Sequence, residues 1–209
     1  MTRPAHAAPN PARRREEVHE SIIQAADRLL KKVGYGQVTI EGIAKEAGAG
    51  KQTIYRWWPN KAAIFNEIYD ALAARTIPPP DLGSCEAELA DYCFHVHKLW
   101  RETGAGSALT GMIAGVVEDP SMMPLWRDDF LQRRREAVRT ILRRGQTRGE
   151  IAKNLDLETA TDVIFGVNMY RLLTDQLIKT KEEALKIAAL IVAGLKGAKA
   201  KRASAKDKN

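Results

Sequence analysis

The stretch from Thr39 to Lys61 limits the fold more than any other part of the chain, because its pattern predicts two short helices joined by a tight break. Thr39 stands where a helix N-cap belongs, since its hydroxyl can accept from the free amides of the first turn. Apolar residues then recur at helical spacing up to a small, glycine-rich break at residues 47–50. After it, Ile54 and Trp58 are four residues apart and share one face. The pattern is typical of a helix-turn-helix.

The second helix of this pair has a polar side made of hydrogen-bond donors. Lys51 and Tyr55 are four residues apart, so both can reach the phosphates of one DNA strand. Gln52, Thr53 and Arg56 can face base edges, because Gln and Arg make bidentate contacts to adenine and guanine. We therefore predict a DNA-binding surface. Its expected contact residues are Thr39, Lys51, Gln52, Thr53, Tyr55, Arg56, Trp57 and Lys61.

Helical periodicity continues on both sides of this pair. A first helix is expected to close at Gly34 and Gly36, and a fourth is expected to begin after Asn60. Lys61 lies in the first turn of that fourth helix, where free amides would help it to meet a phosphate. Prolines at 78–80 mark a domain boundary. The expected division is a disordered arm at 1–12, a DNA-binding domain at 13–77, a second domain at 81–196 and a basic, disordered tail at 197–209.

The second domain is expected to be helical throughout. Its segments lack the sustained alternation of a strand, and the breaks between them hold Gly, Pro, Asn or Asp. The expected fold class is therefore all-α, with about nine helices: a three-helix helix-turn-helix domain and a helical ligand-binding and dimerisation domain. Helices beyond the prolines are expected over 86–102, 107–118, 120–148, 157–180 and 181–196.

Charge and cysteine content give only weak information about the partners and the cellular compartment of the protein. The 33 Lys+Arg against 26 Asp+Glu give a formal charge of +7, which suits a polyanionic partner but also many basic enzymes. Cys85 and Cys93 are expected about 12 Å apart along one helix, too far for a disulfide. The longest apolar run, 187–195, is far short of the roughly 20 residues of a membrane span, and no secretion leader is recognised. A cytoplasmic setting is the default expectation, with no membrane contact.

Residues 16–70 resemble the N-terminal domain of the TetR family of transcriptional regulators. The resemblance rests on spaced positions that agree in order, namely Gly34-Tyr35, Val38-Thr39-Ile40, Ile43-Ala44, Ala47-Gly48, Lys51-Gln52-Thr53-Ile54-Tyr55 and Asn60-Lys61. It implies a homodimeric repressor that leaves a palindromic DNA operator when a small-molecule ligand binds the C-terminal domain. The two recognition helices of such a dimer sit about 34–36 Å apart to meet successive major grooves. No cofactor is implied.

Two positions depart from the family pattern. Gly50 stands where the family often has a Ser or Thr that caps the recognition helix, which weakens that cap by a few tenths of a kcal/mol. Trp57 and Trp58 replace a smaller aromatic pair. One of the two is expected to pack in the core and the other to lie against the DNA backbone.

The expected dimer seam lies in the last two helices, 157–180 and 181–196. Residues 187–195 are apolar on all sides, and a helix of that kind must be buried all round. The preceding helix offers a matching apolar surface for a two-fold interface. The alternative is that both helices only close the core of their own domain.

Bulky and soft side chains of the central helices are the candidate lining of a ligand pocket. As a set they favour an apolar or aromatic ligand, although each alone is more typical of a packed core. Met122 and Tyr170 belong to the wider set. The predicted pocket residues are Tyr92, Trp100, Met112, Met123, Trp126, Phe130, Phe165 and Met169.

Other site chemistries have weaker support. Cys93 and His97 share a helix face, but His95 points nearly opposite, so the three do not converge on one metal ion. Hydrogen-bonded or exposed histidines are the better interpretation, and no metal site is predicted. The string at 48–51 is not a phosphate-binding loop, because Gln52 stands where that loop needs Ser or Thr and no strand precedes it.

Two other classes of protein compete with the ligand-responsive regulator. An enzyme is disfavoured, because the chain carries none of the hydrolase, zinc-protease, redox or dinucleotide motifs. An architectural DNA binder that uses basic tails without sequence preference is the other alternative. It would show salt dependence without a specificity ratio.

Overall fold

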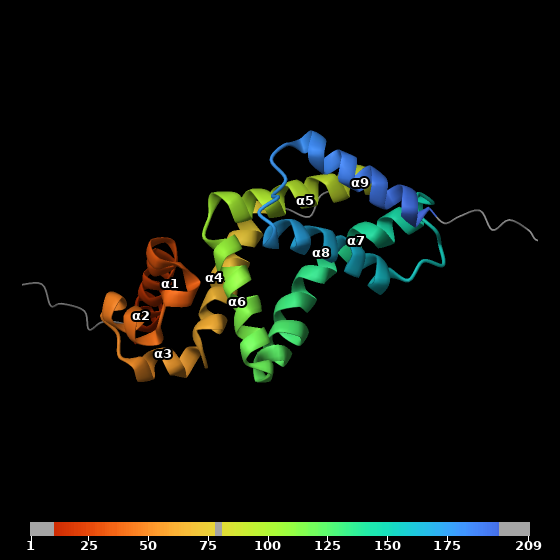
Figure 1. Ribbon diagram of the computed structural model, residues 1–209. Coiled ribbons are helices and arrows are strands. Elements are labelled where there is room, and N and C mark those ends of the chain that lie inside the picture. Colours follow the sequence, from red (N-terminus) through yellow and green to blue (C-terminus); the bar gives the residue numbers. More distant parts are fainter. Residues whose placement is uncertain (1–10, 78–80, 197–209) are drawn as a thin grey trace, which may run out of the picture. The chain divides into compact units, whose positions relative to one another are not determined.

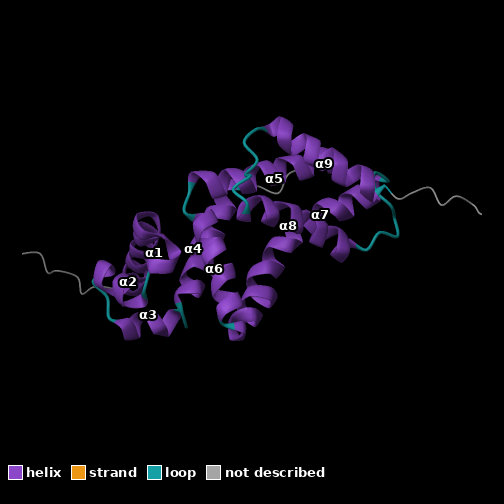
Figure 2. Ribbon diagram, viewed as in Figure 1, coloured by secondary structure: helices purple, strands orange, loops and turns teal. Residues whose placement is uncertain are grey.

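A computed structural model describes residues 11–77 and 81–196 (Figure 1). Every regular element in these ranges is a helix, which confirms the all-α fold class (Figure 2). The expected basic tail, 197–209, lies outside the described residues, as does most of the expected arm at 1–12. The first helix already includes Pro11, which suits a helix start because proline lacks the amide hydrogen that the first turn leaves unbonded.

The described chain forms two compact units. The first holds the described residues of Met1–Leu72 together with Thr103–Val117, and the second holds Ala73–Glu102 with the described residues of Glu118–Asn209. The chain therefore passes between the units three times, at residues 72/73, 102/103 and 117/118. A helix that the sequence assigned to the second domain, at 107–118, thus belongs to the unit of the helix-turn-helix.

The first unit is built from five helices around an aliphatic core. Fully buried side chains from four of them, Ile22, Ile43, Ile54 and Ile64, form its centre. Its elements are α1 (Pro11–Gln37), α2 (Ile40–Ala47), α3 (Lys51–Trp57), α4 (Lys61–Thr76, shared with the second unit) and α6 (Ala105–Glu118) (Figure 1).

Helix α6 approaches α1 through glycine positions. A Cβ atom added at Gly111 would lie 2.3 Å from Cδ1 of Tyr35, and one added at Gly104 would lie 2.9 Å from Cδ2 of Leu30. Tyr35 follows Gly34, whose φ of 74° interrupts the helix where the sequence predicts its end. The buried Tyr35 ring also packs on Phe65, with 5.2 Å between ring centroids. Only a residue without a side chain lets this backbone come so close to the Tyr35 and Leu30 side chains.

The second unit surrounds α5 with the later helices. α5 packs most extensively on α9 and also contacts α7 and α8. Cys85 and Cys93 are buried in it as free thiols, and burial raises the pKa of each to about 11. The elements are α5 (Cys85–Glu102), η1 (Pro120–Met122), η2 (Leu125–Leu131), α7 (Gln132–Arg148), α8 (Leu157–Leu173) and α9 (Lys181–Leu195).

The prediction of a single helix over 120–148 is wrong for the first part of that segment. The segment begins with the 3₁₀ turn η1, capped by Asp119, whose Oδ1 accepts from the Ser121 amide at 3.0 Å. Pro124 then precedes the π-helical turn η2. Regular α-helix begins only at Gln132. Because two prolines remove amide donors within five residues, the first turns cannot keep the uninterrupted α-helical bonding that periodicity alone suggests.

The helix expected over 157–180 ends earlier, at Leu173. Asp175 adopts a left-handed conformation with φ 56°, its amide donates to the Leu172 carbonyl, and the Gln176 amide donates to the Arg171 carbonyl. These two bonds are those of a Schellman motif, which satisfies the last carbonyls of a helix and turns the chain away. Among the described residues, no helix is long and apolar enough to cross a membrane.

Candidate nucleic-acid interface

Helix α2 begins and ends as the sequence predicts. The Thr39 hydroxyl oxygen accepts from the Gly42 amide at 3.0 Å, which confirms its role as N-cap. Gly48 closes the helix in the left-handed conformation, with φ 64°, and its amide donates back to the last turn. The tight break to the next helix therefore depends on a glycine, because side chains rarely adopt this conformation.

Helix α3 is held by few buried side chains. Among its seven described residues, Ile54 alone is fully buried, and Trp58 just after it is buried as well. Gly50 precedes the helix and offers no side chain to cap it, as the sequence indicates. The Thr53 and Ile54 amides donate to the Gly50 carbonyl instead. The orientation of α3 thus depends mainly on Ile54 and on the buried Trp58 just after its C-terminal end.

The predicted contact residues on α3 point largely away from the core. Lys51, Gln52, Tyr55 and Arg56 are exposed, with Tyr55 at 52 %, while Thr53 and Trp57 are half-buried. Thr39 is exposed too. An exposed tyrosine amid amide, hydroxyl and cationic donors gives α3 a face able to reach phosphates and base edges.

One acidic residue belongs to this face. Lys51 Nζ lies 2.6 Å from Glu41 Oε1 of α2, and this contact lowers the pKa of Glu41 below its usual value. The pair is exposed, so solvent screens it. A phosphate that approaches Lys51 competes with Glu41 for the ammonium, which reduces the net gain of that contact.

Lys61 lies differently from its predicted role. Its half-buried ammonium donates to the Tyr35 carbonyl at 3.1 Å and to the Val38 carbonyl at 3.0 Å, and it sits 4.5 Å from the centroid of the Tyr35 ring. These contacts turn Lys61 inward and tie the start of α4 to the segment before α2. The predicted phosphate contact at Lys61 would have to compete with them.

Two domain models match the chain. Residues 22–68 match the model described as bacterial regulatory proteins of the tetR family, and residues 79–191 match the model described as a tetracyclin repressor-like C-terminal domain. The chain belongs to the TetR family. It is therefore a DNA-binding transcriptional regulator and not an enzyme.

Relatives agree with this assignment over most of their length. The HTH-type transcriptional regulator YdeS of Bacillus subtilis is 33 % identical over 160 residues, which cover 77 % of this chain and 80 % of YdeS. SrpR of Pseudomonas putida, another HTH-type regulator, is 30 % identical over 166 residues, or 73 % of this chain and 72 % of SrpR. The crystal structure of the TetR-family regulator SCO0332 superposes on this chain with a TM-score of 0.70. The two sequences are 26 % identical, and the match covers 85 % of this chain and 98 % of the SCO0332 chain.

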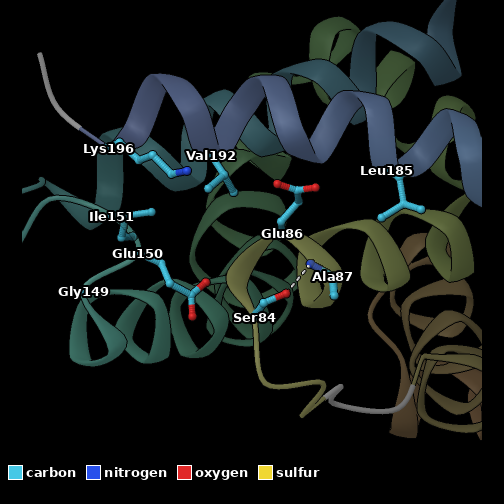
Figure 3. A pocket seen from close by; sticks show the side chains of 9 residues that line it. All are labelled: Ser84, Glu86, Ala87, Gly149, Glu150, Ile151, Leu185, Val192 and Lys196. Atoms are coloured by element: carbon cyan, nitrogen blue, oxygen red, sulfur yellow. Dashed lines mark hydrogen bonds between the residues drawn. The ribbon is translucent and has the colours of Figure 1, made fainter.

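In this TetR-family chain, the surface grooves of the second unit include two that are lined by described residues. The larger, of about 670 Å³, runs between the start of α5, the α7–α8 connection and α9 (Figure 3). Glu86 and Glu150 lie on its walls with Leu185 and Val192. A smaller groove of about 380 Å³ follows the arginine-rich face of α7. Of the residues that line these two grooves, none belongs to the predicted pocket.

The predicted pocket residues are instead dispersed. Tyr92, Trp100 and Phe130 are buried in the second unit, whereas Met112 is buried in α6 of the first. Met123 is 40 % exposed. Three members, Trp126, Phe165 and Met169, are half-buried. Trp126 stacks on Phe130 with 4.8 Å between ring centroids, which is ordinary aromatic packing. The pocket stays a prediction.

The histidines of α5 have protein partners. His97 is fully buried; its Nδ1 accepts from the Ile178 amide at 3.1 Å and its Nε2 bonds Asn168 Oδ1 at 2.8 Å. Burial lowers the pKa of His97 to about 4, so the ring is neutral with its proton on Nε2. His95 lies 3.1 Å from Asp91 Oδ2. In the described ranges no three His, Cys, Asp or Glu side chains gather as a metal site.

Sequence reasoning missed a cluster at the C-terminal end of α3. His19 of α1 lies against both Trp57 and Trp58, with ring centroids 5.5 and 4.8 Å apart, and Glu67 of α4 bonds both His19 and Trp58. The unusual tryptophan pair was the available signal. It could not reveal partners that lie 39 positions upstream and nine downstream of Trp58 in the chain.

Proposed function

We propose that this regulator is a homodimeric repressor, released from a palindromic operator when a small molecule binds in the second domain. The exposed donor face of α3 is the observation that carries DNA recognition. It presents Lys51, Gln52, Tyr55 and Arg56 to solvent on a helix whose opposite side is anchored by Ile54. A single recognition helix reads only a few base pairs, so two copies at fixed separation are needed for a specific site.

Loss of DNA affinity in Lys51→Ala and Tyr55→Ala tests this face. Each change removes an exposed donor from α3 and is expected to weaken operator binding about tenfold, because a charged or polar hydrogen bond contributes about 1–3 kcal/mol. DNA selected from a random pool by the wild-type protein serves as the probe in gel shifts.

Lys45→Ala is the matched control, since Lys45 is an exposed lysine of α2 outside the predicted contact set. It removes the same charge. Equal losses in Lys45→Ala and Lys51→Ala would mean that only net charge matters, as an architectural binder requires. Normal binding by both α3 variants would refute the contact assignment.

A second copy of the chain fits the outer side of α8 and α9. Val163, Tyr170 and Leu173 of α8 are 48 %, 60 % and 57 % exposed and lie with Gly166 on one helical stripe. Leu190 of α9 is 77 % exposed. Exposed apolar side chains that gather on one helix face, as on α8, can mark an interaction surface.

Within its own chain, α9 is buried on one side only. One stripe, Ala184, Ala188, Val192 and Leu195, is buried within the second unit, whereas Leu190 lies on the opposite side. The buried stripe closes the core, and the exposed one supports our proposal of a dimer seam.

Leu190→Glu is expected to shift the protein toward monomer, because the interface would have to bury an unpaired carboxylate. Sedimentation velocity measures the change in mass, and circular dichroism should show unaltered helix content. Leu82→Glu makes the same exchange at a leucine that is 54 % exposed but lies outside α8 and α9. A dimer that survives Leu190→Glu, or dissociates equally in Leu82→Glu, would contradict this seam.

Release by a ligand follows from differential affinity. A small molecule can free the operator only if it binds more tightly to the state with the wrong separation of recognition helices. The predicted pocket residues favour an apolar or aromatic compound. A thermal-shift screen of such compounds, with each hit retested for DNA release, identifies the effector or shows that stabilisation and release are unrelated.

A further inference from the structure

The anchor of α3 is a single carboxylate shared between three helices. Trp58 follows α3 directly, is only 3 % exposed, and its amide donates to the Ile54 carbonyl. Its indole Nε1 donates to Glu67 Oε2 of α4 at 2.8 Å. The other oxygen, Glu67 Oε1, lies 2.9 Å from His19 Nε2 of α1. The direction in which α3 leaves its anchor is therefore set by contacts with both α1 and α4.

Rings complete this cluster. His19 lies tilted over Trp58, with 4.8 Å between centroids, and meets Trp57 edge-on at 5.5 Å. Trp57 and Trp58 also meet edge-on at 5.5 Å. Aromatic pairs at these separations and angles are favourable and have a defined geometry. The imidazole thus holds both tryptophans from one side while the carboxylate holds one of them through its indole proton.

We propose that His19 and Glu67 are positioning residues for DNA recognition, which act through Trp58 by fixing the direction of α3. The cluster suits this role because α3 has little else to orient it: Ile54 is its one buried residue within the described range, and Gly50 provides no cap. The side chains of His19 and Glu67 are 36 % and 44 % exposed, so they add little to the core. Their effect on recognition is larger than their effect on stability.

Whether removal of the Glu67 carboxylate weakens or strengthens DNA binding distinguishes a positioning role from a purely electrostatic one. Removing a carboxylate from a unit that binds a polyanion should strengthen binding if only charge matters. Positioning requires the opposite. Glu67→Ala is expected to weaken binding of the selected DNA about tenfold, since it removes a charge-assisted hydrogen bond from the indole. Glu20→Ala is the matched control, because the exposed Glu20 bonds Gln24 within α1.

Conservative variants and a double mutant test whether Glu67 acts through Trp58. Glu67→Gln keeps an acceptor for the indole and should bind within about threefold of wild type. Trp58→Phe keeps a buried ring but loses the donor, so it should weaken binding as Glu67→Ala does. Combining the two should add no further loss, because both remove the same interaction. The indole N–H resonance of Trp58, assigned by its absence in Trp58→Phe, should shift in Glu67→Ala and much less in Glu67→Gln.

This inference rests on the DNA contacts proposed for α3, and Lys51→Ala keeps the two claims separable. If Lys51→Ala loses affinity while Glu67→Ala binds like wild type, the contact face stands and the positioning role is rejected. The role is also rejected if Glu67→Gln fails to recover binding, if Glu20→Ala weakens binding equally, or if the losses of Glu67→Ala and Trp58→Phe add. Weakened binding that Glu67→Gln restores, without additivity, supports it.

Discussion

Gly111→Ala is expected to destabilise the unit that carries the helix-turn-helix, although a glycine-to-alanine change inside a helix normally stabilises by roughly 0.5–1 kcal/mol. The added methyl would lie 2.3, 2.5 and 2.7 Å from Cδ1, Cγ and Cβ of Tyr35. These atoms lie at the base of a buried ring, so they cannot move aside without moving the end of α1. Overpacking of this kind costs about 1–3 kcal/mol. Urea unfolding followed by circular dichroism measures the net change.

Gly115→Ala provides the control in the same helix. Apart from its chain neighbours and the backbone of its own helix, no described atom lies within 4 Å of a Cβ built at Gly115, so only helix propensity applies. This variant is expected to gain roughly 0.5–1 kcal/mol. Opposite signs at positions 111 and 115 would show that α6 is docked on Tyr35 in solution. Two stabilising changes would mean that α6 does not make this contact.

The placement of α6 could not be predicted from the sequence. Its residues have a helical pattern like that of any neighbouring segment, and nothing in that pattern indicates a packing role for Gly104 or Gly111. Their role arises from the close approach of Leu30 and Tyr35, which lie more than 70 residues away in the chain. Periodicity predicts which residues form a helix, but it holds no information about the partner of that helix.

Local chemistry was predicted more successfully. The cap at Thr39, the glycine-rich break that includes Gly48, and the shared face of Ile54 and Trp58 each depend on residues within a few positions of one another. Backbone conformation and hydrogen bonds decide such features, and the sequence displays both. For the same reason the donor face of α3 could be predicted. Family resemblance extended this prediction to DNA-binding transcriptional regulation, and the domain matches confirmed that step.

Predictions that depend on tertiary contacts were less successful. Lys61 has the charge and place of a phosphate contact, but its ammonium donates to the carbonyls of Tyr35 and Val38, partners that the sequence does not reveal and with which a phosphate would compete. The end of α8 was missed because Asp175, rather than a glycine, adopts the left-handed conformation. The cluster of His19, Trp58 and Glu67 joins three helices. In each case the deciding partner lies outside the local pattern, or the residue type is uncommon for its conformation.

Acidification is expected to weaken the second unit through His97. The folded state holds this ring neutral with a pKa of about 4, whereas an unfolded histidine has a pKa near 6.5. As pH falls below 6.5 the unfolded chain binds the proton first, so the free energy of unfolding falls until the folded ring also titrates near pH 4. The slope approaches about 1.4 kcal/mol per pH unit, and the total loss is about 3 kcal/mol.

His97→Gln isolates this contribution from that of the carboxylates. Glu158, whose pKa is lowered to about 2 by hydrogen bonds from Arg139 and Arg135, also loses its stabilising effect in acid, but it does so in both proteins. The variant should be less stable at pH 7.5, because Asn168 and the Ile178 amide lose their partner. Urea unfolding should show this gap narrowing by about 2–3 kcal/mol at pH 4.5. A gap that stays constant with pH would mean that folding leaves the pKa of His97 unchanged.

The hydrogen bond between the Ile178 amide and His97 also bears on the proposed dimer seam. Ile178 lies between α8 and α9, and α5 binds both of its backbone groups, the amide through His97 and the carbonyl through Arg101. Protonation of His97 turns its Nδ1 from an acceptor into a donor that faces the Ile178 amide, so this link must break. Acid should therefore loosen the α8–α9 connection before it unfolds the rest of the second unit. Amide hydrogen exchange at Ile178, measured between pH 7 and 5 and corrected for the intrinsic rate, should lose protection while the amides of α5 retain theirs.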